Sequence, residues 1–311
     1  MEKKIFNLDF RGRKLVVESG ELAKQAAGAV LVRYGDTAIL SASVMSKNAT
    51  TGDFFPLTIN YQEKLYSVGK IPGGFIKREG RPTEQAILAA RLIDRPIRPL
   101  FAEGFRNEVQ VISTVLSVDQ DCSPEMTALF GSSLALMISN IPFEGPVAGV
   151  VVGHYNNEFV ISPDAELIGD CDLILNVAGT KDAINMVESG SKEVSEELMI
   201  EAIMFGHEAI KELCQFQEEI TREIGVEKIE VELAHIDDAL REEVSDYARS
   251  NMLMAIQIKD KLEKYAKIDE VKEDTINYFS EKYSDSEDLE TILKNVKTLV
   301  DTIEGEEVRK L

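Results

Sequence analysis

A glycine-rich, basic segment is the part of this sequence whose residue types and spacing most directly indicate chemistry. Residues 64–106 hold nine basic and four acidic side chains, although the 311-residue chain has a formal net charge of −21. Within this segment Phe75, Lys77 and Arg78 follow a run of glycines. A ring that stacks on a base, beside cations that meet phosphates, binds single-stranded nucleic acid without sequence preference. We therefore expect a local polyanion site here.

Four further arginines lie at the end of this loop and after it. Pro82 and Pro96 bracket a predicted helix over 83–94, which we expect to stop at Pro96. Arg91 and Arg95 are four residues apart and therefore share a helix face. The planar guanidinium of each can form two parallel hydrogen bonds to phosphate oxygens. The alternative is that Arg91, Arg95 and Arg98 pair with Asp94 and other carboxylates, and that Phe75 packs on the core. Composition leaves both readings open. The arginines are Arg81, Arg91, Arg95 and Arg98.

An acidic string, residues 164–172, is the second candidate site. Asp164 and Asp170 precede a predicted strand and have oxygen atoms of the kind that bind magnesium. Aspartate is also a routine turn residue, and this reading is the one we favour. The sequence has no nucleophile motif and no Walker A loop.

Composition excludes several protein classes. The apolar runs are too short to span a membrane, so we expect a cytoplasmic protein without a membrane partner. Three widely separated cysteines, Cys122, Cys171 and Cys214, predict neither disulfides nor a zinc site, and we expect each to fill space in the core.

The elements that must position these residues form an α+β pattern up to about Ala178. Short β-like runs alternate with the 83–94 helix and a second helix over 124–139, and Tyr34-Gly35-Asp36 predicts a hairpin turn. A long amphipathic helix over 194–224 ends at Gly225. The predicted strands are 14–18, 29–33, 37–44, 54–61, 108–118, 149–154, 159–162 and 173–178.

After Gly225 the pattern becomes helical. Periodic apolar residues predict helices over 240–265, 271–283 and 289–303, a small all-α bundle. We therefore predict domains at 1–225 and 237–311, joined by a linker at 226–236. The bundle is strongly acidic, so its surface is expected to repel RNA.

Several motifs resemble the first RNase PH-like domain of the polynucleotide phosphorylase family. They include the stretch at 54–63, the glycine-rich loop with Arg81-Pro82, the proline-punctuated arginine string at 90–101, and 107–111. The match continues through 177–180, 186–189 and 205–208, and the acidic helical stretch resembles the family's next domain. The resemblance implies a mixed β/α domain of the RNase PH-like type (ribosomal protein S5 domain 2-like), followed by an all-α bundle.

The resemblance also implies a function. Family members are cytoplasmic, ring-shaped homotrimers that degrade mRNA from its 3′ end with inorganic phosphate, release nucleoside diphosphates and need magnesium. Their first domain contributes an aromatic and basic constriction, which maps onto Phe75, Ile76, Lys77 and Arg78. The family loop commonly has two phenylalanines and two arginines, so Ile76 and Lys77 are departures that lose one stacking platform and keep the charge.

In this family the phosphate and metal site belongs mainly to a second RNase PH-like domain, followed by KH and oligonucleotide-binding-fold domains, and these are expected to lie outside this chain. The resemblance therefore implies weak, vestigial metal binding at most for Asp164 and Asp170, and no catalytic residue in this chain. The chain is then expected to bind and guide single-stranded RNA and to help form the ring without catalysis of its own, with RNA-degradation complexes as possible partners. Two alternatives stay open. One is a non-catalytic assembly module that binds an acidic protein, and the other is a stand-alone RNase PH-type enzyme that trims tRNA.

Overall fold

The computed structural model of the chain describes residues 2–52, 54–75 and 77–311. Two compact units are present, Met1–Leu233 and Ala234–Leu311. The first unit combines two β-sheets with helices, and the second is helical. The α+β fold class followed by a helical bundle is thereby confirmed.

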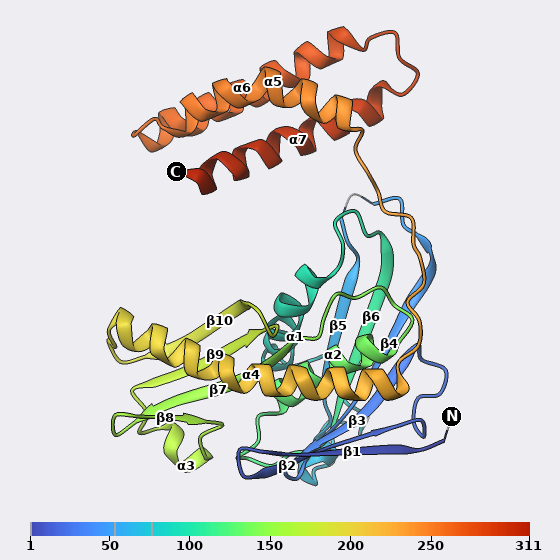
Figure 1. The fold of residues 1–311 in the computed structure, drawn as a ribbon, viewed down its shortest axis with the longest axis vertical. Helices are drawn as coiled ribbons and strands as arrows, with labels where there is room; N and C mark the ends of the chain where they lie inside the picture. Colours follow the sequence, from blue (N-terminus) through green and yellow to red (C-terminus); the bar gives the residue numbers. More distant parts are fainter. Residues whose placement is uncertain (1, 53, 76) are drawn as a thin grey trace. The chain divides into compact units, whose positions relative to one another are not determined.

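A six-stranded sheet forms one layer of the first unit (Figure 1). Its strand order is β1-β2-β3-β4-β6-β5, and every neighbouring pair is antiparallel except β5 with β6, which is parallel. Parallel strands need a crossover connection, and here it contains α1 and the candidate loop. The elements are β1 (Lys4–Phe10), β2 (Arg13–Ser19), β3 (Gly28–Tyr34), β4 (Thr37–Ala49), β5 (Leu57–Glu63), β6 (Asn107–Ser117) and α1 (Glu84–Ile97).

The second sheet has four antiparallel strands in the order β10-β9-β7-β8. Helix α2 contacts strands of both sheets, and twelve of its fifteen residues are buried, which explains why it is apolar all round. Helix α4 packs along β7 and β9. The elements are α2 (Pro124–Ile138), β7 (Ala148–Tyr155), β8 (Glu158–Ile161), the short α3 (Ala165–Ile168), β9 (Leu173–Gly179), β10 (Ile184–Ser191) and α4 (Glu196–Ile224).

The segment that follows α4 is held against the first unit. Lys228 donates hydrogen bonds from Nζ to the carbonyl oxygens of Leu136, Met137 and Ser139, at 2.8, 2.9 and 2.7 Å. These carbonyls lie at the C-terminal end of α2, where helix carbonyls lack an intrahelical partner. Burial lowers the pKa of Lys228 to about 8. One ammonium group thus donates hydrogen bonds to three carbonyl oxygens at the C-terminal end of α2.

The second unit consists of α5 (Asp238–Ile256), α6 (Lys261–Lys282) and α7 (Leu289–Lys310), with an apolar core of its own. The predicted helix over 240–265 is in fact two helices. Asp260 caps the start of α6 by accepting a hydrogen bond from the Glu263 N–H at 2.9 Å, and aspartate is a favoured residue at this position. The apolar period runs through the break, so periodicity alone did not detect it.

Two further differences have clear causes. α1 extends to Ile97, because Pro96 lies in its last turn, where only one helical hydrogen bond is lost. β10 was not predicted, since only Met186 of its eight residues is buried and no alternation marks it. The predicted turn at Tyr34-Gly35-Asp36 is confirmed: Gly35 has φ +57°, and a Cβ there would lie 2.6 Å from the Asp119 carboxylate. No helix among the described residues is long and apolar enough to cross a membrane.

Candidate nucleic-acid interface

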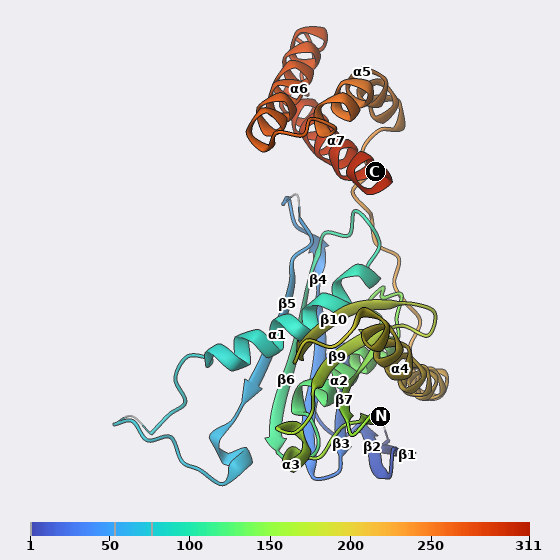
Figure 2. The same cartoon turned by 90° about the vertical axis from the view of Figure 1, so that its left-hand side faces the viewer.

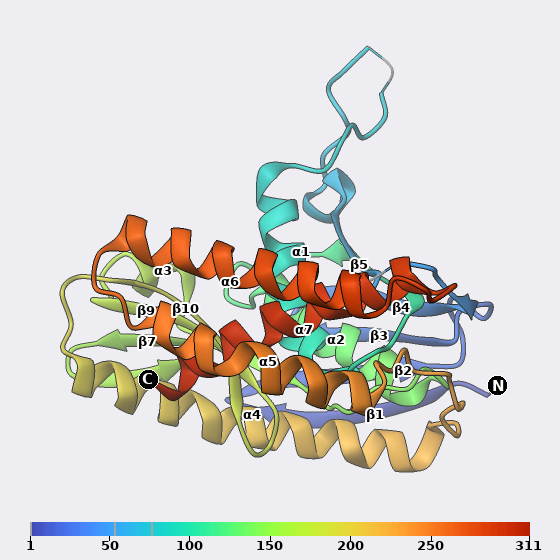
Figure 3. The same ribbon diagram turned by 90° about the horizontal axis from the view of Figure 1, so that it is seen from above.

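The loop between β5 and α1 leaves the body of the first unit (Figures 2 and 3). It passes through a short 3-10 helix, Leu65–Val68, and returns at Thr83, whose side chain caps α1 by accepting from the Ala86 N–H. Phe75 is 103% exposed, so it is not packed on the core. An unburied phenylalanine has its ring available for a ligand. Ile76, the predicted departure from the family loop, lies outside the described residues.

A single carboxylate joins the two arms of this loop at its base. Glu79 Oε1 accepts a hydrogen bond of 2.8 Å from the Leu65 N–H, and its Oε2 lies 3.8 Å from Lys64 Nζ. Gly69 ends the 3-10 helix in the left-handed conformation, with φ 70°. The base is therefore fixed by hydrogen bonds, and the arms beyond it carry the exposed side chains.

Beyond Lys64, which lies near Glu79, three cations of the loop have no acidic partner among the residues that the structure describes. Lys77, Arg78 and Arg81 are exposed, and within the described ranges none of them forms an ion pair. Unpaired cations around an exposed ring suit phosphate groups that flank a stacked base. The structure thus brings Phe75, Lys77, Arg78 and Arg81 together on one loop.

The three arginines of α1 and its end differ from one another. Arg91 is exposed and makes no ion pair with any residue that the structure describes. Arg95 lies 2.8 Å from Glu188, and both side chains are about half exposed. An exposed pair of this kind contributes little to stability, so phosphate can replace the carboxylate at small cost.

Arg98 belongs to the fold. Its guanidinium forms two hydrogen bonds to Asp94, of 2.8 and 2.7 Å, and donates to the carbonyl oxygens of Phe55 and Leu57, at 3.0 and 3.2 Å. It also lies over the Phe55 ring, 5.6 Å from the centroid. The alternative reading, that these arginines pair with carboxylates, therefore describes Arg98 fully and Arg95 in part.

Sequence reasoning missed a groove of about 510 Å³ between α1, the start of α2 and the loop after β8. Asp121, Glu125 and Glu188 line it, and no basic residue appears among its described lining residues. Helix N-termini often bind anions, but here Ser123 accepts from the Met126 N–H and donates to Glu125 at 2.9 Å. Phosphate at this helix end would meet the Glu125 carboxylate, so the groove does not suit an anion.

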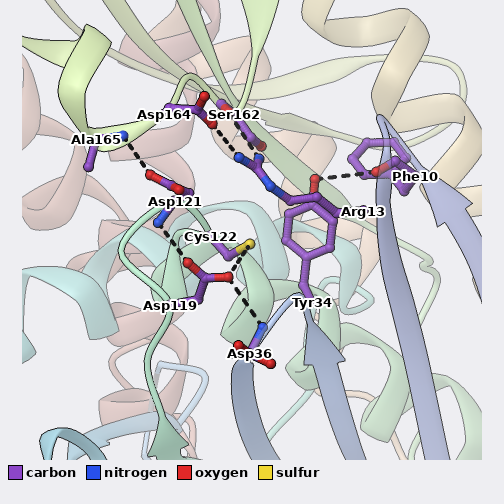
Figure 4. Close-up of polar contacts among 10 residues, drawn as sticks. All are labelled: Phe10, Arg13, Tyr34, Asp36, Asp119, Asp121, Cys122, Ser162, Asp164 and Ala165. Atoms are coloured by element: carbon purple, nitrogen blue, oxygen red, sulfur yellow. Dashed lines mark hydrogen bonds and ion pairs between the residues drawn. The ribbon is translucent and has the colours of Figure 1, made fainter.

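The acidic string is tied into a cluster of polar contacts (Figure 4). The Arg13 guanidinium forms an ion pair with Asp164 and donates to the Ser162 carbonyl at 3.2 Å. Asp170 is exposed after α3. Among the described residues, no three His, Cys, Asp or Glu side chains are arranged to hold a metal ion. The described residues therefore do not fit a magnesium site. Asp164 instead connects β2 to the loop that follows β8.

Asp119 is the second centre of this cluster. Its carboxylate accepts from the N–H groups of Asp121 and Asp36, at 3.1 and 3.3 Å, and these bonds lower its pKa. Burial, together with this carboxylate, raises the pKa of Cys122 to about 12. All three cysteines are buried and unpaired, as predicted. The cluster has a structural role, because it joins the β3–β4 turn to the start of α2.

Three family models match the chain. The 3′ exoribonuclease family domain 1 covers residues 11–142, domain 2 of the same family covers 145–209, and the polyribonucleotide nucleotidyltransferase RNA binding domain covers 239–311.

Relatives named polyribonucleotide nucleotidyltransferase match the chain throughout. The one from Bacillus licheniformis is 61% identical over 310 residues, with 100% of this chain and 43% of the relative covered. Those from Bacillus subtilis and Enterococcus faecalis are 58% and 57% identical, with 100% of this chain and 43% and 44% of their own lengths covered. The chain thus spans less than half the length of these relatives.

A solved structure, that of rice (Oryza sativa) Rrp46, shares the fold with a TM-score of 0.53 and 15% identity, over 70% of this chain and 95% of the rice chain. Together with the relatives, the family models establish membership, and the chain belongs to the polyribonucleotide nucleotidyltransferase family, where it corresponds to the N-terminal part of its relatives.

Proposed function

We propose that this chain binds single-stranded RNA and guides it within a phosphorolytic 3′-to-5′ exoribonuclease that releases nucleoside diphosphates. The observation that carries the proposal is the loop between β5 and α1, with a fully exposed Phe75 beside unpaired cations. In a chain of net charge −21, such a site concentrates the attraction for phosphate in one place. Arg91 and Arg95 extend the track along α1, whereas Arg98 supports it from within the fold.

The chemistry of phosphorolysis is assigned to other parts of the whole enzyme. Transfer to phosphate requires an anion held in line and a cation to take up developing charge. The groove beside α2 is acidic, and Asp164 is bound by Arg13. We propose that inorganic phosphate is the co-substrate, that Mg²⁺ is required, and that both are bound outside residues 1–311. This chain then acts as a track and lacks catalysis of its own.

Assembly into a cytoplasmic homotrimer is the third part of the proposal. Ile200 and Met204 are four residues apart on α4, and 61% and 51% of their surfaces are exposed. Ile87 and Leu88 of α1 are also more than half exposed. Exposed apolar side chains on these two helices favour protein contacts, which supports an assembly role beside RNA binding.

Filter binding of a labelled oligo(A) at several salt concentrations tests the proposal. We expect the combined variant Lys77→Ala with Arg78→Ala to bind at least tenfold more weakly at moderate salt. Its salt slope should be smaller by about 1.4, because two phosphate contacts contribute roughly 0.7 each on single strands. The matched control is Lys14→Ala with Lys24→Ala, which removes two exposed lysines elsewhere in the first unit.

A phosphate-dependent degradation assay on the same samples separates the remaining functions. Binding without shortening of the RNA is the expected outcome. Shortening by residues 1–311 alone would show a working phosphorolytic centre in this chain. Equal binding by the loop variant and its control would leave the assembly role as the main function.

A further inference from the structure

The helical unit presents an electrostatic problem. Residues 239–311 match a family model described as an RNA binding domain, yet residues 234–311 hold twenty acidic and twelve basic side chains. Such a surface repels a polyanion on average. We therefore expect RNA to bind this unit where the local net charge is positive. A positively charged segment of the unit is the candidate RNA contact.

The start of α6 is such a segment. Residues 259–267 hold four lysines and two acidic residues, whereas the rest of the unit holds eight basic and eighteen acidic residues. One of the two acids, Asp260, is occupied by capping α6 through the Glu263 N–H. The capping carboxylate keeps its charge, so four lysines and two acids give this turn a net charge of +2.

The first lysines of this turn are available, whereas Lys267 at its end lies 2.7 Å from Glu270. Lys259 and Lys261 are exposed and form no ion pair with the residues described by the structure. By contrast, Lys272 lies 2.7 Å from Asp301 and 2.8 Å from Glu304. The difference separates a binding surface from the charges that hold the bundle together.

Tyr265 gives this turn a ring for stacking. The other aromatic residues of the unit pack on one another, as in the stacked pair Tyr247 and Tyr278, whose centroids are 4.1 Å apart. Tyr265 makes no ring contact with any described aromatic residue, and 51% of it is exposed. Lys264 Nζ lies 5.8 Å from its centroid, so a cation accompanies the ring.

We propose that Lys259, Lys261, Lys264 and Tyr265 form a second contact for single-stranded RNA on the helical unit. The ammonium groups meet backbone phosphates, and one base stacks on Tyr265. This inference rests on the proposed function, because it names a second site for the same ligand. It also reverses, for this one turn, the expectation that the helical surface repels RNA.

The test uses residues 1–311 and a single-stranded oligo(A) probe. In the triple variant Lys259→Ala, Lys261→Ala, Lys264→Ala, we expect at least a fivefold loss of affinity and a salt slope smaller by about 2, since three contacts of about 0.7 are lost. The control triple, Arg241→Ala, Lys297→Ala, Arg309→Ala, removes equal charge from exposed positions of the same unit. Thermal melting confirms that both variants are folded.

A second measurement locates the contact directly. Photocrosslinking with 4-thiouridine in the oligonucleotide, followed by peptide mass spectrometry, should label Tyr265. Tyr265→Phe should keep the affinity, and Tyr265→Ala should lower it several-fold.

The outcomes distinguish this inference from the proposed function. If the Lys77→Ala, Arg78→Ala variant loses affinity while the α6 triple variant binds like its control, the α6 site is wrong and the proposed function stands. If wild type does not bind the probe at all, both are wrong. Binding of polyglutamate by the α6 turn, with unchanged RNA affinity in the triple variant, would assign the turn to an acidic protein partner and overturn the inference.

Discussion

The loop between β5 and α1 and the cluster around Arg13 and Asp119 are both rich in charge, yet they use it in opposite ways. In the cluster, the guanidinium of Arg13 and the carboxylates of Asp119 and Asp164 have partners within the fold. In the loop, Lys77 and Arg78 have none among the described residues. The comparison teaches that charge count does not mark a binding site. We propose the binding site where exposed cations lack a partner among the described residues.

The sharpest version of this contrast lies along α1, between Arg98 and Arg91. Arg98→Ala removes hydrogen bonds to Asp94 and to two backbone carbonyls, so we expect a loss of about 2 kcal/mol in the free energy of unfolding. Urea unfolding measures it. Arg91→Ala should leave the unfolding midpoint unchanged and weaken RNA binding instead. If both variants behaved alike, the division between structural and binding arginines would be lost.

Phe75→Ala tests the loop without altering its charge. The ring is fully exposed, so its removal should not change the melting temperature. RNA affinity should fall about tenfold, because stacking on one aromatic ring contributes roughly 1–3 kcal/mol. The salt slope should stay the same, which distinguishes this change from loss of a cation. Fluorescence anisotropy with a labelled oligonucleotide measures both quantities, and Phe75→Tyr serves as the control.

The cluster predicts a pH-dependent effect that the loop does not. The pKa of Asp119 is lowered by backbone N–H donors, so its contribution to stability is fully present above its unfolded pKa, about 3.9, and is lost as the pH falls through the lower folded-state pKa. Asp119→Asn should therefore cost roughly 1 kcal/mol at pH 7 and at pH 5, and progressively less as the pH falls through the folded-state pKa. Urea unfolding at these pH values checks the trend. The exposed Asp9→Asn is the control.

The smallest expected effect concerns the carboxylate at the base of the loop. Glu79→Ala removes the acceptor for the Leu65 N–H and releases the two arms, which should weaken RNA binding about threefold, within the value of one hydrogen bond. Glu79→Gln retains an oxygen acceptor and should restore most of the affinity. Full loss in the glutamine variant would instead assign the effect to charge.

The sequence predicted most of the first unit, because its buried strands alternate and the loop is marked by glycines and cations. Two features depended on contacts between residues far apart in the sequence, and a third on a local signal that the apolar pattern hid. Arg95 contacts Glu188, ninety-three residues away, whereas Arg98 contacts Asp94, four residues before it. The acidic groove draws on residues from 85 to 188. The start of α6 depended on one capping residue, Asp260, inside an unbroken apolar pattern.

Lys228 has a consequence for the order in which this chain becomes complete during synthesis. The ribosome makes α2 about ninety residues before it makes the lysine that satisfies the last carbonyls of α2. Until that lysine emerges, the carbonyl oxygens of Met137 and Ser139 lack this donor. The first unit therefore completes its contacts only after α4 and Lys228 have been synthesised. This step comes shortly before synthesis of the helical unit begins.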